Sequence, residues 1–286
     1  MYHIKIFIEL TRLNKPIGFM LLFWPCSWGL AYAYLDNQNL SLFFYYLILF
    51  FFGSILMRSA GCIFNDIVDK DYDKKVQRTK NRPIASGKIS VRHSLVYVIS
   101  LCSIAFFVLI QFNLLTVILG MASMILAFSY PFMKRITYWP QLFLGITFNW
   151  GVILAWTAIN NVLGYEIMIL YLSAIFWTLG YDTIYGAQDM SDDEIIGLKS
   201  TSLKFRKNIR LFVSICYFIF LTLITYLFHN YFGSNIFTFF LMLFIISLLY
   251  QLIKLKRDKS ENYLKLFKLN NYTGFFLFLS IISTNL

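Results

Sequence analysis

Residues 41–63 read SLFFYYLILFFFGSILMRSAGCI and contain a single charged side chain, Arg58. An apolar helix of about 20 residues crosses the hydrocarbon core of a bilayer, so this segment is long enough to span a membrane. Other segments share its character, and none shows the alternation of apolar and polar residues that is typical of a membrane β-barrel. The nine predicted spans are residues 17–35, 41–63, 93–112, 114–132, 141–159, 163–187, 209–228, 235–253 and 267–284. We therefore expect an all-α, polytopic membrane protein with nine transmembrane helices.

The composition supports this class and excludes others. Of the 286 residues 59% are hydrophobic and only 14% are charged, with a mean hydropathy of +0.66. Soluble domains carry about 25% charged residues, and disordered chains carry far fewer apolar ones. The 4 cysteines and 3 histidines are scattered without metal-ligand spacing. Residues 1–286 are thus predicted to form one integral-membrane domain, with no disulfide framework and no histidine metal site.

The basic residues predict the orientation in the membrane. The 25 Lys and Arg residues all lie on one side of the nine-span arrangement, because the connections at 36–40, 113, 160–162 and 229–234 contain none. The positive-inside rule places the basic side in the cytoplasm, with the amino terminus inside and the carboxy terminus outside. This asymmetry also accounts for the net charge of +11, so we expect membrane lipid and no nucleic acid as a partner. The absence of an Arg- and Ser-rich extension before Ile17 favours a bacterial plasma membrane over a mitochondrial inner membrane.

Two acidic motifs lie where predicted spans two and six end. The first is NDIVDKDYD, residues 65–73, and the second is DTIYGAQDMSDD, residues 182–193. In each motif three polar residues are spaced by four, which places them on one face of a helix. The two sets are related by an offset of 120 positions and consist of Asn65, Asp69, Asp73 and Tyr185, Asp189, Asp193.

The offset predicts an internal repeat. Its halves are expected at about residues 12–135 and 136–255, each with four spans, followed by the ninth helix at about 267–284. An even number of spans per half keeps the halves parallel, so both motifs open toward the same side. We therefore expect the two motifs to face each other across a central cavity that is open to the cytoplasm.

Carboxylates in this arrangement favour a divalent cation. Oxygen ligands without His or Cys suit Mg²⁺, which binds proteins through one or two carboxylates together with substrate phosphates. We predict that Mg²⁺ is the cofactor and that Asp69, Asp73, Asp189 and Asp193 are its ligands and the catalytic residues. Neighbouring Lys and Arg side chains can bind the remaining phosphate oxygens.

Further motifs surround the two acidic ones. They are Arg58–Cys62, RTKNRP at 78–83, YPFMKR at 130–135, GLKST at 197–201, and Arg12 with KPIG at 15–18. Together with the acidic motifs they resemble the UbiA superfamily of intramembrane prenyltransferases over nearly the whole chain. The RTKNRP and YPFMKR segments resemble the branch that acts on 4-hydroxybenzoate in ubiquinone biosynthesis. The resemblance implies Mg²⁺-dependent transfer of a polyprenyl group from polyprenyl diphosphate to the ring carbon ortho to the hydroxyl of 4-hydroxybenzoate, with no protein partner.

The resemblance also implies roles for individual residues. Asn65, Lys134 and Lys199 match positions that bind diphosphate oxygens, and Arg82 is added to that group. Arg135 is the first candidate for the carboxylate of the aromatic acid, and Arg58 is the second. The full set of substrate-binding residues implied is Asn65, Asp66, Arg58, Arg82, Lys134, Arg135, Asp182, Tyr185 and Lys199.

Two alternatives remain at this point. One is a related prenyltransferase that uses another aromatic acceptor. The other is a cation-coupled transporter, since intramembrane carboxylates and a two-fold repeat also occur in carriers. The acids lie at one face rather than at the midplane and are accompanied by Lys and Arg, which argues against transport. The length of the isoprenoid chain and the acceptor of the ring proton are left open.

Overall fold

The computed structural model describes residues 2–255 and 260–285, and every regular element in these ranges is a helix. The α-helices are α1 (Tyr2–Thr11), α2 (Ile17–Asn37), α3 (Leu40–Val68), α4 (Lys70–Asp73), α5 (Val91–Leu109), α6 (Leu114–Ile136), α7 (Pro140–Asn160), α8 (Tyr165–Gly186), α9 (Met190–Ile196), α10 (Thr201–Lys204), α11 (Ile209–Leu227), α12 (Ile236–Lys254) and α13 (Ser260–Ile282). Two short 3₁₀ turns, His229–Tyr231 and Ser283–Asn285, complete them.

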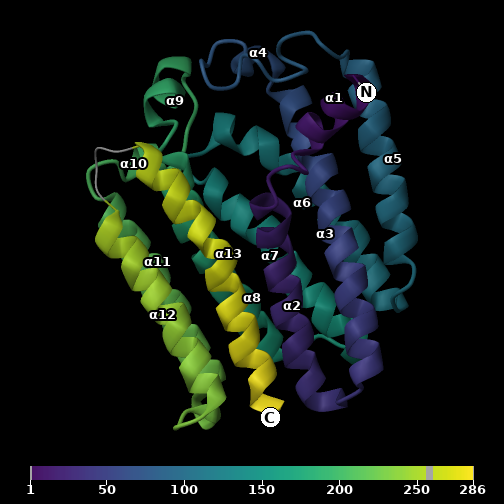
Figure 1. The fold of residues 1–286 in the computed structure, drawn as a ribbon, viewed down its shortest axis with the longest axis vertical. Coiled ribbons are helices and arrows are strands. Elements are labelled where there is room, and N and C mark those ends of the chain that lie inside the picture. Colours follow the sequence, from purple (N-terminus) through teal and green to yellow (C-terminus); the bar gives the residue numbers. More distant parts are fainter. Residues whose placement is uncertain (1, 256–259, 286) are drawn as a thin grey trace.

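The long helices run side by side as a bundle, with the amino terminus at one end and the carboxy terminus at the other (Figure 1). In the described part of the chain, 8 helices are long and apolar enough to cross a membrane: α2, α3, α5, α6, α7, α8, α11 and α12. The predicted all-α, polytopic membrane architecture is therefore confirmed. Helix α13 packs along α2, α8 and α12, and its predicted role as a ninth span stays a prediction.

Polar side chains at the helix starts explain where the apolar stretches are divided. Asn113 separates α5 from α6, and its side chain accepts a hydrogen bond from the backbone N–H of Thr116 at 3.0 Å. Asn39 caps α3 in the same way through Leu42, also at 3.0 Å. Such N-caps satisfy one of the donors left free at a helix start. The predicted break between residues 112 and 114 is thus a real boundary between two helices.

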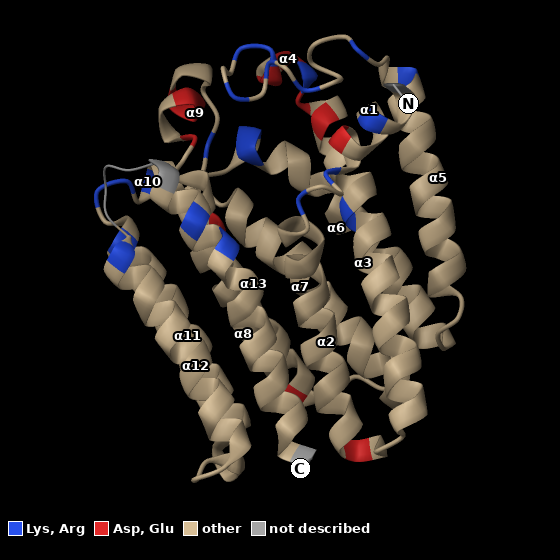
Figure 2. Cartoon of the chain, viewed as in Figure 1, with Lys and Arg blue, Asp and Glu red and all other residues tan. Residues whose placement is uncertain are grey.

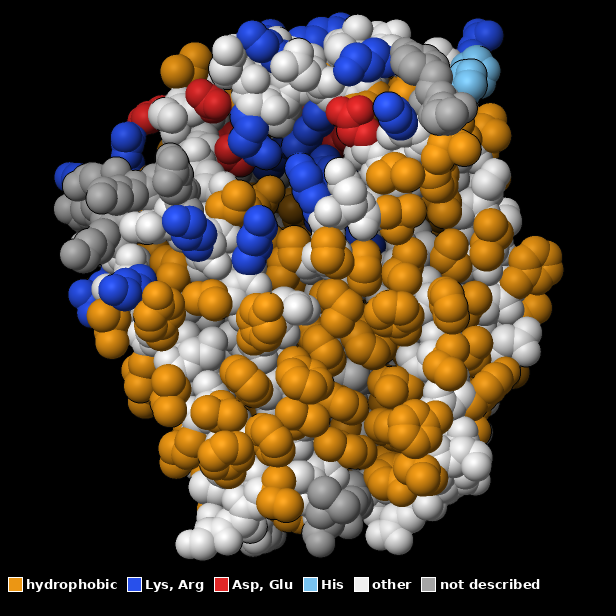
Figure 3. Space-filling view, viewed as in Figure 1, with side chains coloured by type: hydrophobic (Ala, Val, Ile, Leu, Met, Phe, Trp, Pro, Cys, Tyr) orange, Lys and Arg blue, Asp and Glu red, His pale blue; other side chains and the backbone are white. Residues whose placement is uncertain are grey.

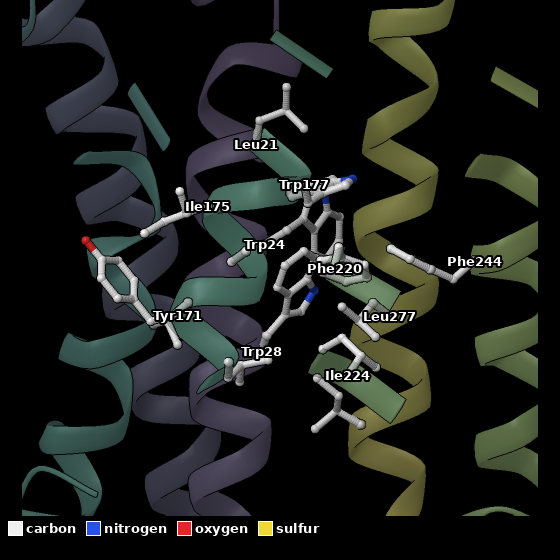
Figure 4. Packing of buried hydrophobic residues seen from close by; sticks show 14 of the residues in the cluster. Leu21, Trp24, Trp28, Tyr171, Ile175, Trp177, Phe220, Ile224, Phe244 and Leu277 are labelled. Carbon is white, nitrogen blue, oxygen red and sulfur yellow. The ribbon is translucent and has the colours of Figure 1, made fainter. Parts of the chain in front are cut away.

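Helix α13 is less hydrophobic than the eight candidate spans, and it carries polar residues into the core. Its Asn270 is fully buried and accepts a hydrogen bond from the Trp177 indole at 3.1 Å. Its Gly274 carbonyl accepts from the Trp28 indole at 2.9 Å. The Trp28 and Trp177 rings lie 4.8 Å apart, beside the ring of Phe220 (Figure 4). Hydrogen bonds of this kind hold helices together where lipid offers no alternative partner.

The charges are gathered at one end of the bundle. Lys and Arg lie at the end that bears the amino terminus, and most of the acidic residues lie there too (Figure 2). Below them the visible surface is dominated by hydrophobic side chains (Figure 3). Three of the basic residues counted for orientation, Lys256, Arg257 and Lys259, lie outside the described residues. The placement of the charged end in the cytoplasm stays a prediction.

Helix α1 was not predicted from the sequence. Its Ile6 and Leu10 are buried against α3, and its Phe7 packs edge-on against the Tyr97 ring at 5.2 Å. The chain then turns at Arg12, a non-glycine residue with a φ of 55°. This left-handed conformation is uncommon for a side chain larger than glycine. The turn brings Arg12 to the charged end of the bundle.

Candidate active site

Both acidic motifs line one cavity of about 910 Å³ that opens at the charged end of the bundle. Figure 3 shows a hollow there, edged by Lys, Arg and acidic side chains and lying above the apolar surface. The first motif lies where α3 meets α4, and the second where α8 meets α9. All the predicted site residues line this cavity except Asp66 and Arg135. The structure therefore brings together two segments that are far apart in the sequence.

The two motifs share their backbone conformation. Asp69 connects α3 to α4 with φ −90° and ψ 3°, and Asp189 connects α8 to α9 with φ −105° and ψ 3°. The amide of Asp73 donates to the Asp69 carbonyl at 2.8 Å, and the amide of Asp193 donates to the Asp189 carbonyl at 2.8 Å. The offset of 120 residues thus corresponds to a similar turn at Asp69 and Asp189, although α3 runs to Val68 and α8 ends earlier, at Gly186.

Asp66 lies behind the cavity lining and holds two arginines in place. Its side chain is 2% exposed and accepts hydrogen bonds from Arg12 Nη2 at 2.6 Å and Arg82 Nη1 at 3.0 Å. The same Arg82 nitrogen donates to Asp73 Oδ2 at 2.8 Å. Burial raises the pKa of Asp73, while the charge of Arg82 acts in the opposite direction. Both arginines line the cavity although Asp66 does not, so Asp66 acts on the site through them.

Asp69 is also buried and has two cationic partners. The ammonium of Lys134 donates to Asp69 Oδ2, and Arg135 Nη2 lies 3.3 Å from Asp69 Oδ1. Arg135 also donates to the Val68 carbonyl at 2.7 Å, and its guanidinium lies 4.8 Å from the centre of the Tyr72 ring. These contacts place Arg135 behind Asp69 and outside the cavity lining.

The second motif has a different partner. Both carboxylate oxygens of Asp189 accept from Arg78, through Nε at 2.8 Å and Nη2 at 2.7 Å. Burial raises the pKa of Asp193 to about 6, and the nearby charge of Asp189 acts in the same direction. Arg78 was not among the predicted site residues. Its only signal in the sequence was its position in the basic RTKNRP segment.

The remaining predicted residues lie deeper or to the side. The Arg58 guanidinium lies 5.2 Å from the centre of the Phe148 ring, and both residues line the cavity. Lys199 donates to the Ile136 carbonyl at 3.1 Å, and the Tyr185 ring lies 4.4 Å from the Phe267 ring, tilted by 38°. Gly18 lies close to Arg58, since a Cβ at that glycine would be 2.8 Å from Arg58 Nε.

The donor set suits a hard divalent cation that is shared with a ligand. Within residues 2–255 and 260–285 no three His, Cys, Asp or Glu side chains are grouped as a metal site. The cavity instead offers two pairs of carboxylates, Asp69 with Asp73 and Asp189 with Asp193. Mg²⁺ commonly takes one or two carboxylates and completes its coordination with substrate phosphates and water. The residues therefore fit Mg²⁺ bound together with a phosphate ligand.

Residues 22–280 match the UbiA prenyltransferase family. The chain belongs to this family. Over 209 residues, 73% of this chain, it is 48% identical to the mitochondrial 4-hydroxybenzoate polyprenyltransferase of Homo sapiens and 47% identical to that of Rattus norvegicus. Over 209 residues it is 46% identical to the protein of the same name from Arabidopsis thaliana. The matched regions cover 56%, 55% and 51% of these relatives, so the chain spans about half the length of the curated relatives it matches.

Solved structures of UbiA homologues share the fold. The apo structure of a homologue from Aeropyrum pernix K1 matches with a TM-score of 0.75 and 23% identity, covering 93% of this chain and 98% of that one. A homologue from Archaeoglobus fulgidus bound to DMAPP and Mg²⁺ matches with a TM-score of 0.67 and 17% identity, covering 97% and 99%. At these identities the likeness establishes the UbiA fold for the bundle described above.

Proposed function

We propose that the protein transfers a polyprenyl group from polyprenyl diphosphate to the ring carbon ortho to the hydroxyl of 4-hydroxybenzoate. The observation that carries this proposal is that one cavity has a charged end and an apolar remainder. Two acidic motifs and several cations line its charged end, and its remainder is lined mainly by apolar side chains. A diphosphate with a long hydrocarbon tail has the same division. The names of the most similar relatives support 4-hydroxybenzoate as the acceptor and ubiquinone biosynthesis as the pathway.

At the charged end, the chain's own residues bind and orient the diphosphate. Asp69, Asp73, Asp189 and Asp193 would hold Mg²⁺, and Asn65, Arg82, Lys134 and Lys199 would bind phosphate oxygens. Bound Mg²⁺ supplies charge neutralisation for the departing diphosphate. Preorganised cations around it lower the barrier further, because they need no rearrangement as negative charge develops.

For the acceptor, the geometry favours Arg58 over Arg135. The Arg58 guanidinium lines the cavity, whereas that of Arg135 is engaged with Val68 and Asp69 behind it. A guanidinium binds a carboxylate through two parallel hydrogen bonds. We therefore assign the benzoate carboxylate to Arg58, and assign to Arg135 the positioning of Asp69.

The reaction breaks the allylic C–O bond of the donor and forms a C–C bond to the aromatic ring. The electron pair of the broken bond leaves with diphosphate, and the ring loses a proton to regain aromaticity. Water would consume the cationic carbon, so the apolar lining protects it. Phe128, Tyr130 and Phe148 line the cavity and present ring faces that can stabilise positive charge.

The tail has an apolar route from the cavity to the outer surface. Ile99 and Phe107 of α5 and Met121 of α6 line the cavity, yet they are 64%, 65% and 49% exposed. Residues that are both lining and exposed mark a side opening between α5 and α6. In a bilayer this opening faces lipid, so a long isoprenoid need not fit entirely inside the protein.

The test is product formation in membranes. Membranes that contain the protein are incubated with 4-hydroxybenzoate, labelled polyprenyl diphosphate and Mg²⁺, with membranes containing Asp189→Asn as the control. We expect labelled prenyl-hydroxybenzoate that disappears when EDTA is added. Label transferred only to other aromatic acceptors would replace the acceptor in the proposal. Failure of folded protein to prenylate any aromatic acceptor would overturn it and favour the transporter alternative.

A further inference from the structure

Arg78 joins two segments that line the cavity at the charged end of the bundle. It lies in the connection between α4 and α5, and it holds both oxygens of Asp189, at the junction of α8 and α9. Two parallel bonds between a guanidinium and a carboxylate form one of the stronger polar contacts in proteins. This contact therefore links the second acidic motif to the segment that follows the first.

The surroundings of this pair differ from those of the buried acids Asp66 and Asp69 in the first motif. Asp66 and Asp69 are 2% and 1% exposed and each has two basic partners. The side chain of Asp189 is 19% exposed, and that of Arg78 is 48% exposed. Both residues line the cavity. Arg78 is thus half-exposed and accessible to a ligand that enters the same cavity.

The geometry creates a competition for Asp189. A metal ion that binds this carboxylate must share its two oxygens with the guanidinium, and the repulsion between the two cations favours the loss of at least one of the two hydrogen bonds. A metal ion that arrives with diphosphate brings phosphate oxygens into the same cavity, and these can accept the displaced Arg78. A metal ion that arrives alone brings no such replacement.

We propose that Arg78 is a positioning residue that makes the second acidic motif select a metal–diphosphate complex over a free metal ion. This inference rests on the proposed function. By linkage, diphosphate then strengthens metal binding by the factor with which the metal strengthens diphosphate binding. Arg78 contributes to this coupling because the hydrogen bonds that it loses from Asp189 are replaced by phosphate oxygens only when metal and diphosphate are both bound.

The test is a titration of Mn²⁺, followed by electron paramagnetic resonance, on the purified protein in nanodiscs, with and without inorganic diphosphate. Wild type is compared with Arg78→Gln and with Arg78→Lys, which keeps the charge but loses the planar fork. Arg206→Gln is the matched control, because Arg206 pairs with Glu194 of α9 at 2.7 Å on the exposed surface and does not line the cavity.

In Arg78→Gln we expect free Mn²⁺ to bind about fivefold more tightly than in wild type, and the strengthening by diphosphate to shrink correspondingly. Arg78→Lys should lie between the two, and Arg206→Gln should match wild type. A purely structural Arg78 would lower thermal stability and leave the effect of diphosphate unchanged, which would overturn the inference. Absence of Mn²⁺ binding to wild type even with diphosphate would overturn the proposed metal site, and this inference with it.

Discussion

The two acidic motifs share a spacing and a backbone conformation but differ in what surrounds them. In the first motif the buried acids Asp66, Asp69 and Asp73 are held by four basic residues: Arg12, Arg82, Lys134 and Arg135. In the second, Asp189 is held by Arg78 alone among the described basic residues, on a half-exposed connection. The pattern of carboxylates is therefore repeated while the rigidity around it is not. We interpret the first motif as the fixed half of the site and the second as the half that adjusts to the ligand.

The largest expected effect tests whether both halves are needed for the reaction. Asp69→Asn and Asp189→Asn should each lower kcat about a thousandfold. Each change removes a carboxylate that would hold Mg²⁺, and the charge of Mg²⁺ neutralises the departing diphosphate. The measurement is the rate of prenyl transfer in membranes at saturating donor. Full activity in both variants would refute the proposal that the two pairs of carboxylates hold Mg²⁺.

Stability should separate the same two variants. Asp69→Asn leaves Lys134 and Arg135 without their buried partner, whereas Asp189→Asn leaves only the half-exposed Arg78. We therefore expect a lower Tm for Asp69→Asn and a nearly unchanged Tm for Asp189→Asn, measured by thermal unfolding in detergent. Equal losses in the two variants would contradict the distinction between a fixed and an adjustable half.

A second stability effect concerns Asp66, which does not line the cavity. Asp66→Asn should destabilise the protein by about 3 kcal/mol, because it leaves the charge of Arg12 without its buried partner and leaves Arg82 with Asp73 alone. Asp192→Asn in the second motif is the matched control, and we expect it to change the stability little. Unfolding of the two variants in increasing denaturant gives the comparison, and a stable Asp66→Asn would show that the first motif is not rigid.

The acceptor end should respond more weakly and more selectively. Arg58→Ala should raise the KM for 4-hydroxybenzoate about tenfold, with little change for the donor, because it removes a charged partner of the carboxylate. Arg135→Ala should instead lower kcat through Asp69. Steady-state kinetics with each substrate varied in turn distinguishes them. A selective effect of Arg135→Ala on the aromatic acid would restore the assignment predicted from the sequence.

The smallest expected effect concerns the tail. Gly53 of α3 lines the cavity, and a Cβ added there would meet no atom within 4 Å. Gly53→Leu should therefore fill part of the apolar region and lower the rate with long donors about threefold relative to short ones, by removing apolar space that the tail contacts. Competition between two donors of different length measures this ratio, and an unchanged ratio would place the tail elsewhere.

Much of this architecture can be predicted from local features of the sequence. Apolar length predicts the long helices, Asn113 marks a boundary between two of them, and spacing by four groups Asp69 with Asp73. Spacing does not show which partners these acids meet, because the partners come from other segments. Arg12 lies 54 positions from Asp66, and Arg78 lies 111 positions from Asp189. The sequence consequently predicts most of the charged residues that line the cavity, but it does not separate Asp66 and Arg135 from the lining or reveal Arg78.

The most direct measurement is anomalous X-ray diffraction from crystals of the protein with Mn²⁺ and a non-hydrolysable thiolo analogue of a prenyl diphosphate. We expect an anomalous peak between the Asp69–Asp73 pair and the Asp189–Asp193 pair, with the diphosphate beside it and Arg78 turned away from Asp189. A peak at only one pair, or a bound analogue with no metal between the motifs, would contradict this expectation.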